Sequence, residues 1–246
     1  MDYETLMIKK ALRFYYITDE EAPGLLPLAQ VEIAIQAGAT MVQFRHKAFS
    51  LKLFDEVAAI RDLAKNNSVP FLVNDDILLA KAVSADGVHL GQTDESPALA
   101  RRILGPDAIV GISASTLKEL ERTDLTSCDY IGTGPVFETR TKKDAKPICG
   151  LDGLGAVVRA SALPVVAIGG INAENASACF RHGAAGIAVI SYISRAANPL
   201  QNARKLWGIC QNPPPNDLMG YLLSSSRPYM LWFWRPRPRM PLITFL

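Results

Sequence analysis

Two short apolar stretches, Val165-Val166-Ala167-Ile168-Gly169-Gly170 and Gly186-Ile187-Ala188-Val189-Ile190-Ser191, decide the fold of this chain. Each is a nearly continuous run of β-branched and small apolar residues, which is typical of a strand buried on both faces of a parallel sheet. Before the first stretch, Val157 and Val158 follow Leu154 at intervals of three and four residues. Such intervals place side chains on one face of a helix. We therefore expect parallel strands joined by helical crossovers.

The same unit of strand and helix recurs along most of the sequence. The eight predicted strands cover residues 13–18, 41–45, 71–75, 87–91, 109–113, 130–136, 165–170 and 186–191. Eight regular units are the number that closes a (β/α)8 TIM barrel, which commonly forms a single domain. We therefore predict an α/β TIM barrel over residues 1–211. An open, doubly wound sheet fits the same alternation and is the structural alternative.

The residue composition of the sequence changes after Gln211. Residues 212–246 begin near Pro213-Pro214-Pro215 and contain further prolines, three consecutive serines and the aromatic run Trp232-Phe233-Trp234. Because proline interrupts both helices and central strands, we expect an irregular tail that does not complete the barrel. An aromatic and basic patch that binds a partner is the alternative interpretation of this tail.

Composition argues against several classes of partner. The chain has 26 Lys and Arg residues against 24 Asp and Glu residues, so its formal net charge of +2 supplies no general field for nucleic acid or membrane. The four cysteines lack the spacing of a zinc site. No secretory signal pattern and no run of roughly 20 apolar residues is present. We therefore expect a cytoplasmic enzyme with small-molecule substrates, and a homo-oligomer is left open.

In a barrel of this kind the loops at the carboxyl ends of the strands build the active site, so polar residues after apolar runs are candidates. Gln43, Arg45 and Lys47 alternate at the end of the second predicted strand, which directs an amide and two cations to one side. A guanidinium clamps phosphate oxygens and an ammonium acts as a point charge, so the pair favours a diphosphate. The alternative is a solvated strand end with incidental charges.

Two aspartates follow the next two predicted strands. Asp75 and Asp94 offer hard oxygen ligands, which together with phosphate oxygens and water can complete the octahedral coordination of Mg²⁺. Each aspartate alone is also a candidate N-cap, because a predicted helix follows each of them. Their combination with a cationic pair favours the metal site.

The remaining strand ends add hydroxyls, glycines and a further cation. The candidate site residues there are Asn74, Ser113, Thr139, Thr141, Lys142, Gly169, Gly170, Ile190 and Ser191. The loop after the sixth strand can close over a bound diphosphate and exclude water. The seventh and eighth strands carry the usual phosphate position of such barrels. We interpret His89, in the fourth strand, as a packed and hydrogen-bonded residue.

Seven short motifs occur in order along the predicted barrel. They are Tyr16-Ile17-Thr18-Asp19, Gln43-Phe44-Arg45-His46-Lys47, Asn74-Asp75, Asp86-Gly87-Val88-His89-Leu90-Gly91-Gln92, Gly134-Pro135-Val136-Phe137, Thr139-Arg140-Thr141-Lys142 and Ala167-Ile168-Gly169-Gly170-Ile171. This set resembles the thiamine phosphate synthase family from about residue 13 to residue 211. No motif is decisive alone, but the ordered set is specific.

The resemblance implies a transferase that joins hydroxymethylpyrimidine diphosphate to a thiazole phosphate, or to its carboxylated form, and releases diphosphate. It implies that the pyrimidine diphosphate is bound by Gln43, Arg45, Lys47, Asn74, Ser113 and Lys142. It implies that Mg²⁺ is bound by Asp75 and Asp94. The implied ligands of the thiazole phosphate are Thr139, Thr141, Gly170, Ile190 and Ser191. The residues with catalytic roles would be Arg45, Lys47, Ser113 and Lys142. In the family, diphosphate leaves first and the thiazole nitrogen then attacks the pyrimidine cation, which suits a site rich in cations.

Two positions depart from the family pattern. Glu138 stands where proline is frequent and adds a carboxylate beside the loop, so loop closure over anions is expected to be weaker. Ser115 stands where many relatives carry histidine.

Three other functions are compatible with parts of the sequence. A thiazole tautomerase of the same superfamily needs an acid/base histidine and no diphosphate site, so Asp75, Asp94 and Lys142 argue against it. A phosphosugar isomerase or epimerase needs a poised base or paired carboxylates, whereas the carboxylates here are expected to face cations. A non-catalytic relative that binds thiamine precursors would keep the same residues, and an assay separates it from an enzyme.

Overall fold

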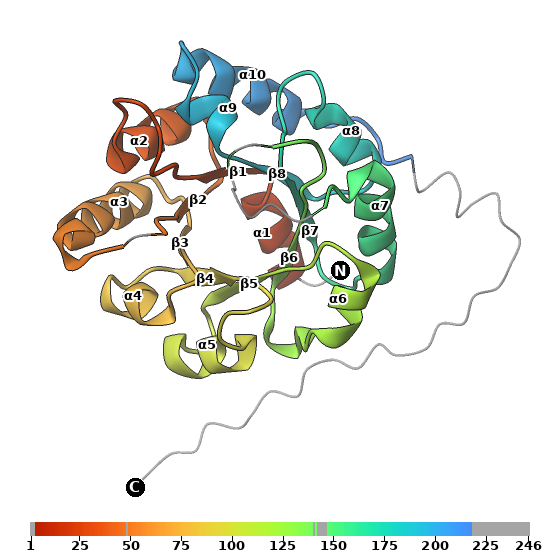
Figure 1. Ribbon diagram of the computed structural model, residues 1–246, viewed down its shortest axis with the longest axis horizontal. Helices are drawn as coiled ribbons and strands as arrows, with labels where there is room; N and C mark the ends of the chain where they lie inside the picture. The colour runs from red at the N-terminus through yellow and green to blue at the C-terminus, as the bar shows by residue number, and fades with distance from the viewer. Residues whose placement is uncertain (1–2, 48, 140, 142–146, 218–246) are drawn as a thin grey trace, which may run out of the picture.

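The computed structural model describes residues 3–47, 49–139, 141 and 147–217, and its centre is a closed barrel of parallel strands in chain order (Figure 1). The strands are β1 (Phe14–Ile17), β2 (Met41–Phe44), β3 (Phe71–Asn74), β4 (Gly87–Leu90), β5 (Ile109–Ser113), β6 (Tyr130–Thr133), β7 (Val165–Ile168) and β8 (Gly186–Val189). Strand β8 pairs with β1 and closes the ring. The predicted (β/α)8 TIM barrel is therefore confirmed, and the open sheet is excluded.

Several strands are shorter at their carboxyl ends than the sequence predicted. Strand β3 ends at Asn74 because the next residue, Asp75, has a φ of 65°, and β7 ends before Gly169, which has a φ of 98°. A left-handed backbone cannot continue an extended strand. Arg45 and Gly170, which were expected at strand ends, lie in the loops that follow.

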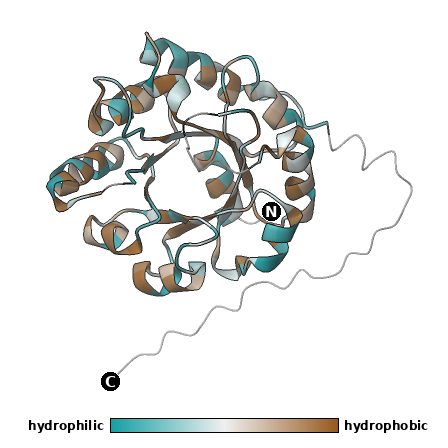
Figure 2. Cartoon of the chain, in the orientation of Figure 1, coloured by the Kyte–Doolittle hydropathy of each residue, from teal (hydrophilic) through white to brown (hydrophobic). Residues whose placement is uncertain are grey.

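Helices surround the barrel. They are α1 (Tyr3–Ala11), α2 (Pro27–Ala37), α3 (Phe54–Asn66), α4 (Ile77–Ala82), α5 (Pro97–Leu104), α6 (Leu117–Arg122), α7 (Gly150–Ala160), α8 (Ala176–Arg181), α9 (Ser191–Ser194) and α10 (Pro199–Gln211), with 3₁₀ turns η1 (Leu51–Leu53) and η2 (Leu125–Ser127). Gly38 ends α2 with a φ of 107°, a conformation that favours glycine. Figure 2 shows a mostly apolar ring of strands inside helices of mixed character, as a two-sided parallel sheet requires.

The apolar core has two parts, one on each face of the barrel wall. The inner cluster contains Leu12, Tyr15, Ile17, Met41, Leu72, Tyr130, Val166, Ala188 and Ile190. The outer cluster lies between strands and helices, and it includes Val42, Val73 and Leu154. Because side chains fill the interior of such a barrel, a ligand binds at its rim and not in a central pore.

Helix α1 was not predicted. It precedes β1, and its residues Ile8 and Ala11 pack against the inner cluster. The helix is visible through the ring of strands in Figure 1. Since α1 leads directly into the amino end of β1, it covers the amino-terminal end of the barrel. Charged and apolar residues mix at the start of the chain without a clear helical period, so this packing could not be predicted from periodicity.

Helix α10 ends at Gln211, the residue at which the sequence predicted the end of the barrel domain. Residues 212–217 continue without helix or strand, and the Asp217 N–H donates to the Arg181 carbonyl over 2.9 Å. The rest of the tail, residues 218–246, lies outside the described residues. None of the described helices has the length and apolar character needed to cross a membrane.

Candidate active site

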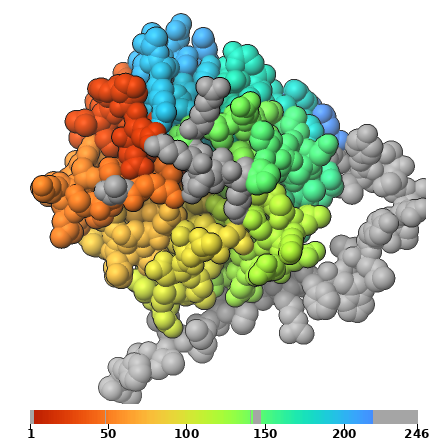
Figure 3. Space-filling view, in the orientation of Figure 1, coloured from red at the N-terminus to blue at the C-terminus, as the bar shows by residue number. Residues whose placement is uncertain are grey.

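A cavity of about 260 Å³ lies at the carboxyl ends of the strands, at the opposite end of the barrel from α1. Its lining comes from the ends of strands β2 to β8 and from the loops that follow them. Figure 3 shows this face of the molecule, where successive parts of the chain follow one another around the ring from red to blue. The carboxyl end is where barrel enzymes build their sites, so this cavity is the candidate active site.

Most of the predicted site residues meet in this cavity. Those that line it are Arg45, Lys47, Asn74, Asp75, Asp94, Ser113, Thr139, Thr141, Gly170, Ile190 and Ser191. Gln43 is not in the lining; it is 1% exposed inside the barrel, where its Nε2 donates to the Tyr15 hydroxyl over 2.5 Å. Lys142 lies outside the described residues. The fold therefore gathers the cations Arg45 and Lys47 and the two predicted carboxylates at one rim.

Arg45 and Lys47 come to the cavity from the loop after β2. The Arg45 side chain is buried, and its Nη1 lies 3.9 Å from Glu20 Oε1, whereas Lys47 is exposed. Thr18 Oγ1 accepts the Arg45 N–H over 2.8 Å, which fixes the backbone at the point where the guanidinium enters. A contact of 3.9 Å is long for a charge-assisted hydrogen bond, so the guanidinium can still bind an anionic ligand.

Asp75 and Asp94 line the cavity and cap no helix. The N-cap of α4 is Asp76, whose carboxylate accepts a backbone N–H of the first turn, and the N-cap of α5 is Ser96. The capping interpretation of Asp75 and Asp94 is therefore wrong. Asp94 Oδ2 instead accepts the Gly91 N–H over 2.6 Å, which holds this carboxylate at the end of β4.

A metal at these two carboxylates would need further ligands. Among the described residues, no group of three or more His, Cys, Asp or Glu side chains is arranged to hold a metal ion. Mg²⁺ is commonly held by one or two carboxylates, with substrate phosphates and water as the remaining ligands. The pair of Asp75 and Asp94 in one cavity fits that pattern.

A chain of hydrogen bonds crosses the barrel interior beneath the cavity. The Tyr15 hydroxyl, which accepts from Gln43, lies 3.0 Å from the Tyr130 hydroxyl. His89 continues the chain: its Nδ1 lies 2.9 Å from Tyr130 Oη, and its Nε2 lies 2.9 Å from Ser113 Oγ. Burial raises the pKa of both tyrosines, so both phenols keep their protons. One direction of donation satisfies every group, and it makes His89 Nε2 the donor to Ser113.

His89 is packed and hydrogen-bonded, as predicted, and it also lines the cavity. When Nε2 donates to Ser113, the Ser113 hydroxyl proton is directed to another acceptor. Gln92, which belongs to a family motif but was given no role from the sequence, also lines the cavity, and its Nε2 donates to the Ser113 carbonyl over 2.7 Å. Two neighbours therefore fix the orientation of Ser113.

The loop after β6 is held against the loop after β7. The Phe137 N–H donates to the Gly169 carbonyl over 3.0 Å. Gly170 has a φ of 66°, and a Cβ there would lie 2.3 Å from the Glu138 carbonyl oxygen. Only glycine therefore fits at this position without a shift of the loop. The Glu138 side chain is exposed and is not in the cavity lining, so its effect on loop closure stays a prediction.

Hydroxyl groups from the loop after β6 and from the start of α9 meet on the β8 side of the cavity. Thr141 Oγ1 donates to Ser191 Oγ over 2.8 Å, and the Thr141 N–H donates to Thr139 Oγ1 over 3.3 Å. Ser115, the second departure from the family pattern, lines the cavity, and its hydroxyl donates to the Gly134 carbonyl.

Other cavity residues were not predicted from the sequence. Gly91, Thr93 and Tyr192 line the cavity, each close in sequence to a residue that was predicted. Residues beyond a strand end have no periodicity that shows which of them turns toward the cavity. The motif that contains Gly91 was visible, but its use as a donor to Asp94 depends on the local turn.

Comparison with known proteins supports one family. The family model described as thiamine monophosphate synthase matches residues 14–193. The chain belongs to the thiamine monophosphate synthase family. A thiamine-phosphate synthase of Chloroflexus aurantiacus is 44% identical over 196 residues, which are 79% of this chain and 90% of that protein. A thiamine-phosphate synthase of Bacillus licheniformis is 43% identical over 201 residues, 80% of this chain and 89% of that protein.

Solved structures agree with membership of the thiamine monophosphate synthase family. Thiamine phosphate pyrophosphorylase of Pyrococcus furiosus has a TM-score of 0.75 and 34% identity, and the match covers 83% of this chain and 98% of that one. A structure titled native KDPGal, at 18% identity and a TM-score of 0.63, shares the fold alone. The family, the barrel and the synthase function expected from the sequence are thereby confirmed, and the roles of single residues stay predictions.

Proposed function

We propose that the chain condenses hydroxymethylpyrimidine diphosphate with thiazole phosphate to form thiamine phosphate and diphosphate at this cavity. The observation that carries the proposal is a single cavity lined by two cations, Arg45 and Lys47, and two carboxylates, Asp75 and Asp94. A diphosphate needs cations for its oxygens, and a metal bound to it needs carboxylate ligands from the protein. Membership of the thiamine monophosphate synthase family supports the same reaction.

The pyrimidine diphosphate would lie on the β2 to β5 side of the cavity. Arg45 and Lys47 would bind its phosphate oxygens, while Asn74 and Ser113 would offer polar groups to the rest of the molecule. Gln43 would act through the interior chain of hydrogen bonds that ends at Ser113. The role of Lys142 as a further cation rests on the family resemblance alone, because this residue lies outside the described part of the chain.

Asp75 and Asp94 would hold Mg²⁺. The chemistry of the donors supports this assignment, because both are carboxylates in the lining and neither is used as a helix cap. The hydrogen bond from the Gly91 N–H leaves the other oxygen of Asp94 available as a metal ligand. When bound, Mg²⁺ would neutralise charge on the diphosphate and make it a better leaving group.

The thiazole phosphate, or its carboxylated form, would lie on the β6 to β8 side. Its proposed partners are Thr139, Thr141, Gly170, Ile190 and Ser191, which all line the cavity. The hydrogen bond between Thr141 and Ser191 supports this grouping, because it brings hydroxyl groups from the loop after β6 and from α9 to one place. Hydroxyl and backbone N–H groups are suitable donors for phosphate oxygens.

The proposed chemistry needs charge stabilisation more than a strong base. The carbon–oxygen bond to the diphosphate breaks first, and the diphosphate takes the bonding electron pair. The thiazole nitrogen then gives its lone pair to the pyrimidine methylene carbon. Neither step removes a proton, so Arg45, Lys47 and the metal would lower the barrier by binding negative charge as it develops.

A direct assay tests the proposed function. Purified protein is given both substrates with Mg²⁺, and each component is omitted in turn while thiamine phosphate and diphosphate are measured. We expect both products in equal amounts, and only in the complete mixture. Conversion of the thiazole substrate without the pyrimidine diphosphate would indicate a tautomerase. Binding without any product would indicate a non-catalytic relative, and either result would contradict the proposal.

A further inference from the structure

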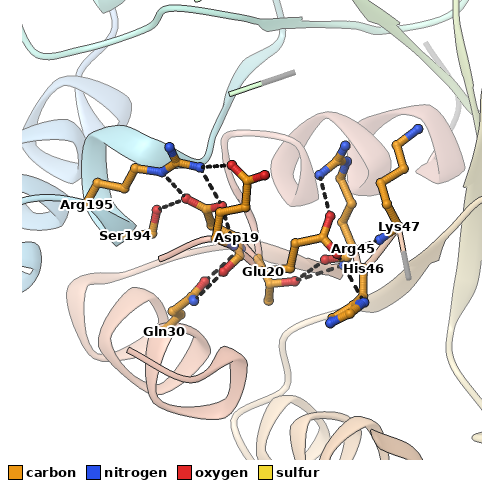
Figure 4. Close-up of polar contacts among 10 residues, drawn as sticks. Asp19, Glu20, Gln30, Arg45, His46, Lys47, Ser194 and Arg195 are labelled. Atoms are coloured by element: carbon orange, nitrogen blue, oxygen red, sulfur yellow. Dashed lines mark hydrogen bonds and ion pairs between the residues drawn. The ribbon is translucent and has the colours of Figure 1, made fainter. Parts of the chain in front are cut away.

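We propose that Thr18, Asp19 and Glu20, here called the positioning segment, orient both halves of the substrate cavity, an inference that rests on the proposed function. The segment follows β1. Among the residues that the structure describes, those of β1 do not line the cavity. Thr18 and Asp19 belong to a motif of the family, yet the proposed reaction assigns them no role. Figure 4 shows the side chains of Asp19 and Glu20 reaching to opposite sides of the segment.

Glu20 contacts the loop that carries the two cations. Its Oε2 accepts the Lys47 N–H over 2.8 Å and lies 3.1 Å from His46 Nδ1, while its Oε1 lies 3.9 Å from Arg45 Nη1 (Figure 4). The closest contact is to the backbone of Lys47 and not to a cationic side chain. Glu20 therefore sets the path of the loop, which decides where Arg45 and Lys47 point.

Thr18 fixes the start of the same loop. Its Oγ1 accepts the Arg45 N–H over 2.8 Å and donates to the Arg45 carbonyl over 3.2 Å. Thr18 and Glu20, the first and last residues of the positioning segment, thus hold three consecutive residues, 45–47. The pair of contacts leaves the loop little freedom to rotate.

Asp19 contacts the opposite side of the cavity through α9, the helix that begins with Ser191. Its carboxylate accepts from Arg195 Nε over 2.7 Å, from Arg195 Nη2 over 3.0 Å and from Ser194 Oγ over 2.8 Å (Figure 4). A bidentate contact of this kind fixes direction as well as distance. Asp19 therefore sets the position of the short helix from which Ser191 lines the cavity.

The positioning segment is itself anchored by a buried glutamine. Gln30 of α2 accepts the Asp19 N–H through Oε1 over 2.8 Å and donates from Nε2 to the Asp19 carbonyl over 2.8 Å. Gln30 is 0% exposed, and its Oε1 also accepts from the Tyr16 hydroxyl over 2.9 Å. Because these buried polar groups would be costly to leave unpaired, the backbone of Asp19 has one arrangement.

Two substitutions of Glu20 separate positioning from charge. Glu20→Ala removes the acceptor for the Lys47 N–H, whereas Glu20→Gln keeps an acceptor oxygen and removes only the charge. We expect Glu20→Ala to raise the KM for the pyrimidine diphosphate roughly tenfold, and the KM for the thiazole phosphate to stay within about twofold. Glu20→Gln is expected to retain both values. The matched control is Glu32→Ala, which removes an exposed carboxylate from α2.

The opposite result would overturn the role of Glu20. If Glu20 acts only as a negative charge near the cations, both substitutions lower the KM for the pyrimidine diphosphate, because the field on an anion becomes more favourable. If Glu20→Ala proves unfolded in a thermal melt, Glu20→Gln decides the question. A lower KM in that variant contradicts positioning, and an unchanged KM supports it.

A substitution of Arg195 tests the contact with α9. Arg195→Lys keeps the charge but cannot bind both oxygens of Asp19. We expect the KM for the thiazole phosphate to rise about fivefold with the KM for the pyrimidine diphosphate unchanged. The control is Arg204→Lys on the exposed side of α10. Equal changes in both KM values would overturn a role specific to this side of the cavity.

A binding measurement separates failure of this inference from failure of the proposed function. Calorimetric titration with Mg²⁺ and inorganic diphosphate needs no turnover. We expect Glu20→Ala to bind diphosphate about tenfold more weakly than Glu32→Ala and the unaltered protein. If this difference appears and no thiamine phosphate is formed in the assay, the proposed function fails and the positioning role stands. Equal diphosphate binding by all three proteins would overturn the positioning role.

Discussion

Charged side chains at the rim of the barrel have partners that fix their direction. Asp94 is held by the Gly91 N–H and Asp19 by Arg195, while Glu20 accepts the backbone N–H of Lys47 and fixes the loop from which the Lys47 side chain extends. Polar groups that are oriented before the ligand arrives cost no reorganisation when charge develops. The geometry of the site therefore depends on hydrogen bonds to backbone groups as much as on the charges of the side chains.

Removal of one proposed metal ligand should change the response to Mg²⁺. We expect Asp94→Asn to lower the turnover rate roughly a hundredfold at a fixed Mg²⁺ concentration, because an amide oxygen binds this cation more weakly than a carboxylate. Part of the loss should be recovered at higher Mg²⁺, and a metal titration of the rate measures this. Asp107→Asn, which removes an exposed carboxylate, is the control. An unchanged metal dependence would remove Asp94 from the metal site.

The contact between Asp19 and Arg195 should make stability depend on pH. Burial alone raises the pKa of Asp19, but hydrogen bonds from Arg195 and Ser194 outweigh it, and the pKa lies below its ordinary value. A lowered folded pKa means that Asp19 stabilises the fold above the unfolded pKa of about 3.9. This contribution is lost as the pH falls through the folded pKa.

Asp19→Asn is therefore expected to lower the free energy of unfolding by about 2 kcal/mol near neutral pH. The difference from the unaltered protein should shrink at acid pH, where the native carboxyl is also neutral. Urea unfolding at several pH values measures both quantities. A difference that grows as the pH falls would contradict the assignment.

Loops and strand ends form the site, and their glycines are the sensitive positions. The loops after β6 and β7 touch through Gly170, where a Cβ would meet the Glu138 carbonyl oxygen at 2.3 Å. A clash with backbone cannot be relieved by a side-chain rotation, so the loop that carries Thr139 and Thr141 must move. The packing of these two loops therefore decides the shape of the β6 to β8 side of the cavity, where the thiazole phosphate is proposed to bind.

Gly170→Ala should therefore impair both stability and substrate binding. The control is Gly24→Ala, because Gly24 has a similar φ of 68° but nothing within 4 Å of a Cβ. We expect the control to lose about 1 kcal/mol through backbone strain alone, and Gly170→Ala to lose clearly more. The KM for the thiazole phosphate should rise in Gly170→Ala only. Equal losses in the two variants would show that the loop contact is unimportant.

The whole molecule is one barrel with a covered amino end and a site at the carboxyl end. Helix α10 completes the outer layer at Gln211, and its residues Ala203 and Leu206 belong to the outer cluster. We propose that residues 1–211 form the functional domain. The described part of the tail, residues 212–217, contacts α8 through Asp217 and Arg181, neither of which lines the cavity.

Truncation after Gln211 should leave the activity within about twofold of the full chain, because irregular termini are commonly dispensable. A small fall in melting temperature is expected from loss of the contact between Asp217 and Arg181. Steady-state rates and thermal melts of the two proteins provide the comparison. A large loss of activity would place the domain boundary later in the chain.

The fold was predictable because strand burial leaves a strong pattern. Stretches such as Val165 to Ile168 are apolar on both faces, and the eight strand positions follow from that alone. Strand ends were less predictable, because the positive φ of Asp75 depends on the turn that follows it. Helix α1 could not be predicted, since its contact with the barrel is tertiary and leaves little periodicity.

The site was predictable as a set of polar strand ends, and less so in its detail. The direction of Gln43 into the barrel follows from alternation, but its contact with Tyr15 needs the closed ring. Within the positioning segment, Thr18 and Asp19 were visible only as part of a family motif, and Glu20 was not singled out by any sequence pattern. Its contact from Asp19 to Arg195 spans 176 residues of sequence, which no local pattern can indicate.

The metal dependence of diphosphate release tests whether cations and carboxylates at this cavity act on one bound diphosphate. The rate of diphosphate release is measured with both substrates, first with Mg²⁺ and then with excess EDTA. If the cations and the two carboxylates proposed to bind Mg²⁺ share one ligand, nearly all activity should be lost in EDTA and recovered when Mg²⁺ is restored. Release at the same rate in EDTA would contradict the metal site, and with it the account of how this cavity works.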